Sequence, residues 1–104
     1  DRELMYRRML DEASIGIYVC DEQTHATLYM NNTLRTQLNI DEETDVSKIS
    51  CYDLLSGENK KFADSYNYDS YQTRTIEHDK GIFYIRGRRI DWNGIPAIIE
   101  YISD

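Results

Sequence analysis

The stretch that decides the fold is residues 81–104, GIFYIRGRRIDWNGIPAIIEYISD, in which two apolar-rich runs flank Asn93-Gly94. An Asn-Gly pair between such runs is a strong signal for a β-hairpin, because both residue types tolerate the positive φ of a two-residue type I′ turn. The turn also fixes the register of the two strands. The predicted pairs are Trp92 with Ile95, Ile90 with Ala97, Arg88 with Ile99, and Arg86 with Tyr101.

Both faces of this hairpin carry apolar residues. One face holds Ile90, Trp92, Ile99 and Tyr101. An antiparallel sheet with one face in water alternates cleanly between apolar and polar residues, and this hairpin does not. We therefore expect other parts of a protein to cover both faces. The residues of the opposite face are Phe83, Ile85, Gly87, Arg89, Asp91, Ile98, Glu100 and Ile102.

Length and composition indicate one globular domain. The chain has 104 residues, 40% of them hydrophobic, and a single proline, which is enough for one core and argues against disorder. Its formal charge of -7 disfavours nucleic acids and direct contact with anionic membrane surfaces. No stretch approaches the roughly 20 apolar residues that span a bilayer, and no signal peptide is visible. The chain begins without Met and stops in a polar junction, so we expect a fragment of a longer protein.

The two cysteines indicate a reducing environment. Cys20 and Cys51 lie in apolar surroundings and show no CxxC spacing. This favours packed, reduced thiols over a disulfide framework. We therefore expect a cytoplasmic domain, whose parent protein could be anchored in a membrane elsewhere.

Residues 1–13 are predicted to form an amphipathic helix. Leu4, Met5 and Met9 fall on one stripe at helical spacing, with Tyr6 beside them. The stripe either covers a face of the hairpin sheet, or pairs with a second copy, or continues upstream as a coiled coil; the first two alternatives are compatible. The residues turned away from the stripe are Arg7, Arg8, Asp11 and Glu12.

The remainder, residues 14–104, is predicted to be a second unit with three further strands. The β-branched and aromatic residues of 14–21 predict a strand, and residues 27–30 predict another that pairs with it. Asn31 or Asn32 caps a short helix that carries Leu34 and Leu38. The acidic residues 41–45 form a solvated loop.

The second half of this unit has a weaker pattern before the final strands. Ser50 and Asp53 resemble a capping box that opens a short helix ending at Gly57. Residues 58–68 are a helix or an irregular connector. The alternation in residues 71–77, YQTRTIE, predicts a strand that turns into the hairpin. The expected fold is α+β, with five antiparallel strands in one sheet.

Three segments carry a resemblance to a known family. Residues 16–38 (GIYVCDEQTHATLYMNNTLRTQL), residues 51–55 (CYDLL) and residues 87–104 resemble a bacterial PAS domain. The similarity is to PAS modules that precede cyclic-di-GMP cyclase or phosphodiesterase domains, or histidine kinases. It implies a five-stranded antiparallel sheet with short helices on one face and an N-terminal capping helix. Asp104 matches the first residue of the Asp-Ile-Thr motif that commonly closes a PAS core and leads into the signalling linker.

The resemblance raises the question of a cofactor, and none is supported. Many similar domains carry a Pro-Cys-x-x-Cys segment, which residues 57–62 replace with GENKKF. A flavin photoreceptor needs an Asn-Cys-Arg-Phe-Leu-Gln-like run, which is missing. Haem needs an axial His, Met or Cys near the middle helices, whereas His25 falls in a turn and His78 at a strand end. Two unclustered histidines and two cysteines do not support a metal site.

A ligand pocket is expected between the sheet and the helices. The resemblance implies that Ile98, Glu100 and Ile102 point into it. Aromatic and apolar residues there either line a cavity or fill the core. The other residues expected to converge on this interior are Tyr18, Cys20, Tyr29, Cys51, Tyr52, Leu55 and Phe62.

Arg89 and Glu100 are the candidate polar residues of the pocket wall. In the predicted register Glu100 lies opposite Gly87, which makes Arg89 its diagonal neighbour on the same face. The pair either orients a small polar or charged ligand or forms a cross-strand ion pair of no more than about 1 kcal/mol. On the opposite face, Trp92, Ile99 and Tyr101 are expected to contact the N-terminal helix or a dimer partner.

Two functions of different class follow from these features. In the first, the domain senses a small molecule and relays a population shift to an output domain in the same chain, which concerns cyclic-di-GMP turnover or a histidine kinase. In the second, it binds no ligand and acts as a dimerisation or interaction module. The chain has no GxSxG, HExxH or Gly-rich phosphate loop, so we expect no catalysis by these residues. The helix order also does not suit a ketosteroid-isomerase-like enzyme.

Overall fold

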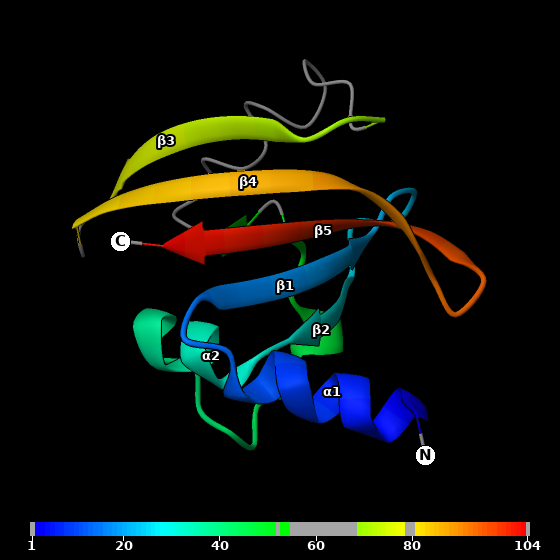
Figure 1. The fold of residues 1–104 in the computed structure, drawn as a ribbon. Coiled ribbons are helices and arrows are strands. Elements are labelled where there is room, and N and C mark those ends of the chain that lie inside the picture. The colour runs from blue at the N-terminus through cyan, green and yellow to red at the C-terminus, as the bar shows by residue number, and fades with distance from the viewer. Residues whose placement is uncertain (1, 52, 55–68, 79–80, 104) are drawn as a thin grey trace.

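The computed structural model describes residues 2–51, 53–54, 69–78 and 81–103. These residues form two α-helices, a 3-10 helix and five strands (Figure 1). The predicted strand over 27–30 has the expected bounds, and the predicted strand over 71–77 is displaced by one residue. In chain order the elements are α1 (Arg2–Glu12), β1 (Gly16–Asp21), β2 (Thr27–Met30), α2 (Asn32–Leu38), η1 (Val46–Lys48), β3 (Gln72–His78), β4 (Gly81–Trp92) and β5 (Ile95–Ser103).

The five strands form one antiparallel sheet, as the sequence predicts, and the structure gives their order as β2-β1-β5-β4-β3. The predicted hairpin register is confirmed at all four pairs. Asn93 has φ 51° and Gly94 has φ 86°, which is the left-handed region that a type I′ turn requires. The N–H of Gly94 also donates to Asp91 Oδ1 over 2.6 Å. This turn therefore sets the register of the two longest strands.

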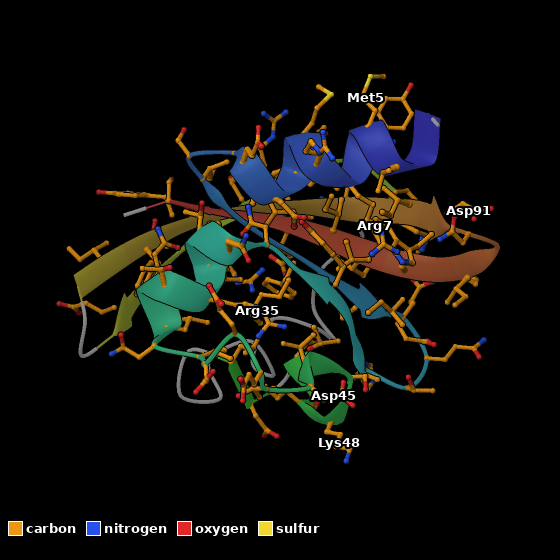
Figure 2. The ribbon with its side chains drawn as sticks, turned by 90° about the horizontal axis from the view of Figure 1, so that it is seen from below. Met5, Arg7, Arg35, Asp45, Lys48 and Asp91 are labelled. Carbon is orange, nitrogen blue, oxygen red and sulfur yellow. The ribbon has the colours of Figure 1, made fainter. Side chains whose placement is uncertain are left out.

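Helices lie on both sides of the sheet. Figure 2 shows α1 on one side of the sheet, with α2 and η1 on the other. We call the side of α1 the outer face and the side of α2 the inner face. Each face has its own buried apolar cluster. The prediction that both faces are covered holds for the inner face and for the part of the outer face beneath α1. The outer cluster contains Ile17, Val19, Tyr29, Ala97 and Ile99. The inner cluster contains Tyr18, Cys20, Met30, Leu34, Cys51, Leu54, Ile76, Phe83, Ile85, Ile98 and Ile102.

The orientation of α1 differs from the prediction. Met5 is 54% exposed and Met9 is 62% exposed, so the apolar stripe faces away from the sheet, and its predicted role in covering the sheet is wrong. Figure 2 shows Met5 pointing outward and Arg7 on the sheet side of the helix. The guanidinium carbon of Arg7 lies 5.1 Å from the ring centroid of Trp92. The other exposed members of the stripe are Leu4 and Tyr6.

Aromatic and polar contacts hold α1 in this orientation. Tyr29 and Trp92 stack with ring centroids 5.6 Å apart, and Arg7 lies over both rings. The Tyr29 hydroxyl donates to Asp11, and burial of the phenol together with this bond raises the pKa of Tyr29 well above its usual value. Leu10 packs against the outer cluster. These contacts use the side of α1 that carries Arg7 and Asp11, so the side that carries the two methionines faces the solvent.

Asn31 joins the two layers. It is the N-cap of α2, as predicted, and its side chain is fully buried. Its Oδ1 accepts from the N–H groups of Ile17 at 2.9 Å and Leu34 at 3.0 Å. Its Nδ2 donates to the carbonyl oxygens of Leu10 and Ile15, each over 2.9 Å. One amide therefore connects α1, β1 and α2.

The connection between α2 and β3 is described in part. Residues 41–45 are exposed, as predicted, and lead into η1, where Asp45 is the N-cap. In the region of the predicted capping-box helix, the N–H of Asp53 donates to the carbonyl of Ser50 over 2.9 Å. Residues 58–68, predicted to be a helix or connector, lie outside the described residues. Among the described residues, no helix is long and apolar enough to cross a membrane.

Candidate functional site

Three polar side chains meet inside the inner face. Glu100 on β5 accepts a hydrogen bond from the hydroxyl of Tyr18 on β1 at 2.8 Å. The same carboxylate binds Arg74 on β3 through two bonds, Nη1 to Oε2 at 2.8 Å and Nη2 to Oε1 at 3.2 Å. All three residues are buried. We call Tyr18, Glu100 and Arg74 the inner network.

A glycine makes this network sterically feasible. Glu100 lies on β5 and Arg74 on β3, so β4 runs between them. The β4 residue opposite Glu100 is Gly87. A Cβ at Gly87 would lie 3.0 Å from Cγ and 3.1 Å from Oε2 of Glu100, which is tighter than ordinary van der Waals contact. The carboxylate therefore passes over the backbone of Gly87 to reach the neighbouring strand.

The electrostatics of the network depend on its burial. The side chains of Arg74 and Glu100 are 2% and 5% exposed, so each charge has lost most of its water. A two-bond guanidinium–carboxylate pair is the geometry that best offsets such a loss. Burial and the nearby Glu100 carboxylate raise the pKa of Tyr18 well above its usual value of 10. The phenol therefore keeps its proton and acts as a donor to Glu100.

The surroundings of the network are apolar and contain both thiols. Cys20 and Cys51 are both buried, as expected for packed thiols. A hydrogen bond with Cys51, followed by burial, raises the pKa of the Cys20 thiol far above its usual range. A thiol with a raised pKa carries little thiolate and is a poor nucleophile or metal ligand. The arrangement is therefore suited to hydrogen bonding with polar groups rather than to covalent chemistry.

Most of the predicted pocket residues that are described lie on the inner face. Tyr18, Cys20 and Cys51 belong to the same buried cluster as Ile98 and Ile102. Glu100 joins them through its bond to Tyr18. The expected convergence of β1, β5 and the segment around Cys51 is thus present. Three further predicted pocket residues lie outside the described residues: Tyr52, Leu55 and Phe62.

Tyr29 is not a pocket residue. It belongs to the outer cluster and stacks on Trp92 beneath α1, so its predicted place in the interior is wrong. The pairing of β1 with β2 matches Tyr29 with Val19, whose side chain is also on the outer face. The register then shifts between Val19 and Cys20, as at a β-bulge. On the other side of the Val19–Tyr29 pair, Tyr18 pairs with Met30, and both belong to the inner cluster, so ordinary alternation places Tyr29 on the outer face.

Arg89 is the diagonal neighbour of Glu100 on the same face, as predicted, but the predicted ion pair between them is wrong. Arg89 is partly exposed and pairs with Glu22 and Asp69, while Glu100 binds Arg74. Gly87 leaves a gap on one side of Glu100 that leads to β3, and the carboxylate turns into this buried gap. Arg89 instead links the turn after β1 to Asp69, three residues before the start of β3.

Arg74 is the site residue that sequence reasoning missed. Alternation in residues 71–77 places it on the same side as Ile76, which is buried, so a buried charge was legible in the strand. Its partner Glu100 could not be predicted from this pattern, because β3 and β5 are separated by β4. A glycine facing a glutamate in the hairpin was the remaining signal.

The residues predicted to contact a helix or a partner divide into four groups. Trp92 contacts α1 through Arg7, as expected. Ile99 is buried in the outer cluster. Tyr101 is half-buried on the outer face. The exposed stripe of Leu4, Met5 and Met9 is open to solvent in this monomer.

The two histidines lie where the sequence predicts, in a turn and at a strand end. His25 is half-buried in the turn between β1 and β2, with φ 65°, and His78 ends β3. Within residues 2–51, 53–54, 69–78 and 81–103, no group of three or more His, Cys, Asp or Glu side chains is placed to hold a metal ion.

Comparison with solved structures identifies the fold. The PAS domain of an HTR-like protein from Haloarcula marismortui matches with a TM-score of 0.72 and 15% identity, covering 100% of this chain and 99% of that chain. The PAS domain of the nitrogen regulation protein NR(II) from Vibrio parahaemolyticus matches with a TM-score of 0.73 and 12% identity, covering 96% and 97%. This chain has the PAS fold.

Other similar structures come from the same class of protein. A sensory box sensor histidine kinase from Vibrio cholerae matches with a TM-score of 0.66 and 15% identity, covering 99% of this chain and 90% of that chain. No protein-family model matches the sequence, and no curated protein is similar to it. The sequence resemblance to PAS domains is thus confirmed at the level of the fold.

Proposed function

We propose that this chain is the sensory domain of a bacterial multidomain signalling protein and that it binds a small polar molecule on the inner face of the sheet. The observation that carries the proposal is the inner network of Tyr18, Arg74 and Glu100. Apolar side chains would fill this small core at lower desolvation cost. A carboxylate, a guanidinium and a phenol at one point instead provide directional hydrogen bonding, which is what ligand sites place among apolar walls.

The network also offers a means of relaying the binding event. A ligand that hydrogen-bonds to Glu100 or Arg74 competes with the bond between them, so ligand-bound and ligand-free states differ in contacts among β1, β3 and β5. Glu100 lies three positions before Ser103, the last residue of β5. In this proposal the output domain follows in the same chain and concerns cyclic-di-GMP turnover or a histidine kinase, and these residues themselves catalyse no reaction.

Two further similar structures are complexes, which is compatible with ligand or partner binding. One is the complex of phage VqmA with DPO, at a TM-score of 0.63 and 14% identity. The other is the DhaR(N)–DhaL complex of E. coli, at a TM-score of 0.63 and 16% identity. They support a binding role for this chain without specifying its ligand.

Native mass spectrometry of the protein purified from cells tests ligand binding. We expect an additional non-covalent mass that disappears on denaturation. The Tyr18→Phe variant removes one hydroxyl from the inner network and should reduce the occupied fraction at least several-fold. The matched control is Tyr84→Phe, because Tyr84 is 54% exposed on the outer face. Wild-type protein without a bound mass, together with an interior filled by its own side chains, would contradict the sensory proposal.

A specific observation supports the alternative, a ligand-free dimerisation module. Leu4, Met5, Tyr6 and Met9 are each more than half exposed on α1. A second copy of the chain that packs on this stripe would bury it. Sedimentation should then show a dimer for the wild type and a monomer for a Met5→Glu, Met9→Glu double variant, with Arg8→Gln as a control on the same helix. A dimer without a bound mass favours the module; a monomer removes it.

A further inference from the structure

The helix α1 leaves half of the outer face bare. It covers β1, β2 and the adjoining part of β5, while β3 and β4 lie toward the opposite edge of the sheet (Figure 1). A groove of about 640 Å³ runs over this bare half. Its volume is in the range of small-molecule sites. The lining residues that matter here are Tyr71, Thr73, Thr75, Tyr84, Arg86 and Tyr101.

Arg86 lines this groove, and Arg88 lies beside it over the same tyrosine ring. The guanidinium carbon of Arg86 lies 3.8 Å from the ring centroid of Tyr71, and that of Arg88 lies 5.1 Å from the same centroid. In the described part of the chain, neither arginine forms an ion pair with a carboxylate, whereas the other two arginines of the sheet, Arg74 and Arg89, both do. This contrast is notable in a chain with 19 acidic and 12 basic residues.

The ring of Tyr71 orients these cations without using their hydrogen bonds. A guanidinium over an aromatic face is held by the ring quadrupole, and its N–H groups remain able to bind an anion at the edge. Two such groups on one ring form a fork for a carboxylate or a phosphate. Threonine hydroxyls at positions 73 and 75 add neutral donors on the adjacent strand.

The groove also offers aromatic surface next to these donors. Tyr84 is 54% exposed, and Tyr101 is half-buried on the other side of the groove. Burial, followed by the nearby Tyr71 phenol, raises the pKa of Tyr101 above its usual value, so its hydroxyl stays protonated at neutral pH. The combination of paired cations, hydroxyl groups and flat rings matches an anionic group attached to a carbon skeleton.

We infer that this groove is a second binding site, separate from the inner network, for a small organic anion. Arg86 and Arg88 bind its carboxylate or phosphate, and its carbon skeleton lies against Tyr84 and Tyr101. The site goes beyond the proposed sensory function, because its binding groups lie on the opposite face of the sheet. Arg74 of the inner network also lines the groove, but its guanidinium is bound to Glu100 and is not one of these groups.

Chemical-shift titration of the 104-residue chain tests the site. The probes are benzoate, succinate and inorganic phosphate at constant ionic strength, with chloride as the reference anion. We expect saturable shifts at the amides of residues 71–75, 84–88 and 101. Benzoate should bind more tightly than inorganic phosphate, since only benzoate has a skeleton for the rings. The reverse order would assign the site to phosphate groups and overturn the role of the two tyrosines.

Matched variants separate the site from general charge effects. Arg86→Gln and Arg88→Gln should each weaken benzoate binding at least tenfold, with an unchanged melting temperature because both side chains are exposed. Arg8→Gln on α1 removes the same charge and should leave the affinity unchanged, as should Tyr18→Phe in the inner network. An equal loss in Arg8→Gln would overturn the inference. Chemical shifts that never saturate with anion, together with loss of self-association in the Arg86 and Arg88 variants, would also overturn it. That result would assign this face to contact with a second copy of the chain.

Discussion

Arg74 and Arg86 lie on neighbouring strands, one residue apart in register, and have opposite fates. Arg86 pairs in the sheet with Thr73, the residue before Arg74, so strand alternation sends the two side chains to opposite faces. Arg74 is buried against a carboxylate, whereas Arg86 lies over a tyrosine ring in an open groove. The difference shows that an arginine in this sheet is buried only where a glycine lets a carboxylate reach it.

The largest expected effect comes from removing one charge of the buried pair. Arg74→Met leaves the Glu100 carboxylate buried without its guanidinium, which should lower the free energy of unfolding by about 3–5 kcal/mol. An Arg74→Met, Glu100→Leu double variant should recover most of this loss, because no charge remains in the core. Urea unfolding measures both. If Arg74→Met lowers the free energy of unfolding by less than about 1 kcal/mol, water reaches the pair. Arg74 would then not differ from Arg86 in its access to solvent.

The next largest effect concerns the joint between the two layers. Asn31→Ala removes an amide that makes four hydrogen bonds to α1, β1 and α2. Because the backbone groups left behind are buried, we expect a loss of about 3 kcal/mol. The control is Asn32→Ala, since Asn32 is adjacent but exposed. Equal losses at both positions, measured by urea unfolding, would contradict the role assigned to the buried amide.

An alkaline titration separates the buried phenol from exposed ones. Folding raises the pKa of Tyr18 above 10, chiefly through burial, so above pH 10 the unfolded chain loses this proton while the folded chain keeps it. Stability therefore falls as pH rises, by up to about 1.4 kcal/mol per pH unit from this residue. Tyr18→Phe should flatten the decline between pH 10 and 11, and Tyr84→Phe should not. Parallel curves for wild type and Tyr18→Phe would indicate that Tyr18 ionises in the folded protein.

The smallest expected effect is on the outer face. Arg7→Met removes a cation that lies over Tyr29 and Trp92 at a partly exposed site, so we expect a loss of about 1 kcal/mol. Arg8→Met on the same helix should change stability by less than half of that amount. Hydrogen exchange of the α1 amides provides a local readout, and faster exchange in Arg7→Met alone would confirm that this contact docks the helix. Equal exchange in both variants would contradict it.

Local patterns predicted much of the fold. The Asn93-Gly94 turn determined the register of β4 and β5, and alternation placed Ile98, Glu100 and Ile102 on one face. The cap at Asn31 followed from residue type and position. Each of these signals spans only a few residues, which is why they could be predicted without the tertiary structure.

The errors arose where distant segments compete for one side chain. Glu100 had two potential arginine partners, and the choice depended on the β3–β4 pairing and on the gap at Gly87. Tyr29 lies on the outer face because it pairs with Val19 rather than with Tyr18, and no local pattern determined this register. The rotation of α1 was decided by an aromatic pair formed by β2 and β4, which outweighed the burial of a methionine stripe. None of these partners is near in sequence.

The passage of Glu100 over Gly87 has a mechanical consequence. The Glu100 carboxylate of β5 binds the Arg74 guanidinium of β3 across β4. Sliding any one of these strands along its axis would therefore stretch this ion pair before the backbone hydrogen bonds break. The ion pair thereby makes these three strands one rigid part of the sheet. A displacement of β5 is thus transmitted to β3, at the edge of the sheet, through a single side-chain ion pair.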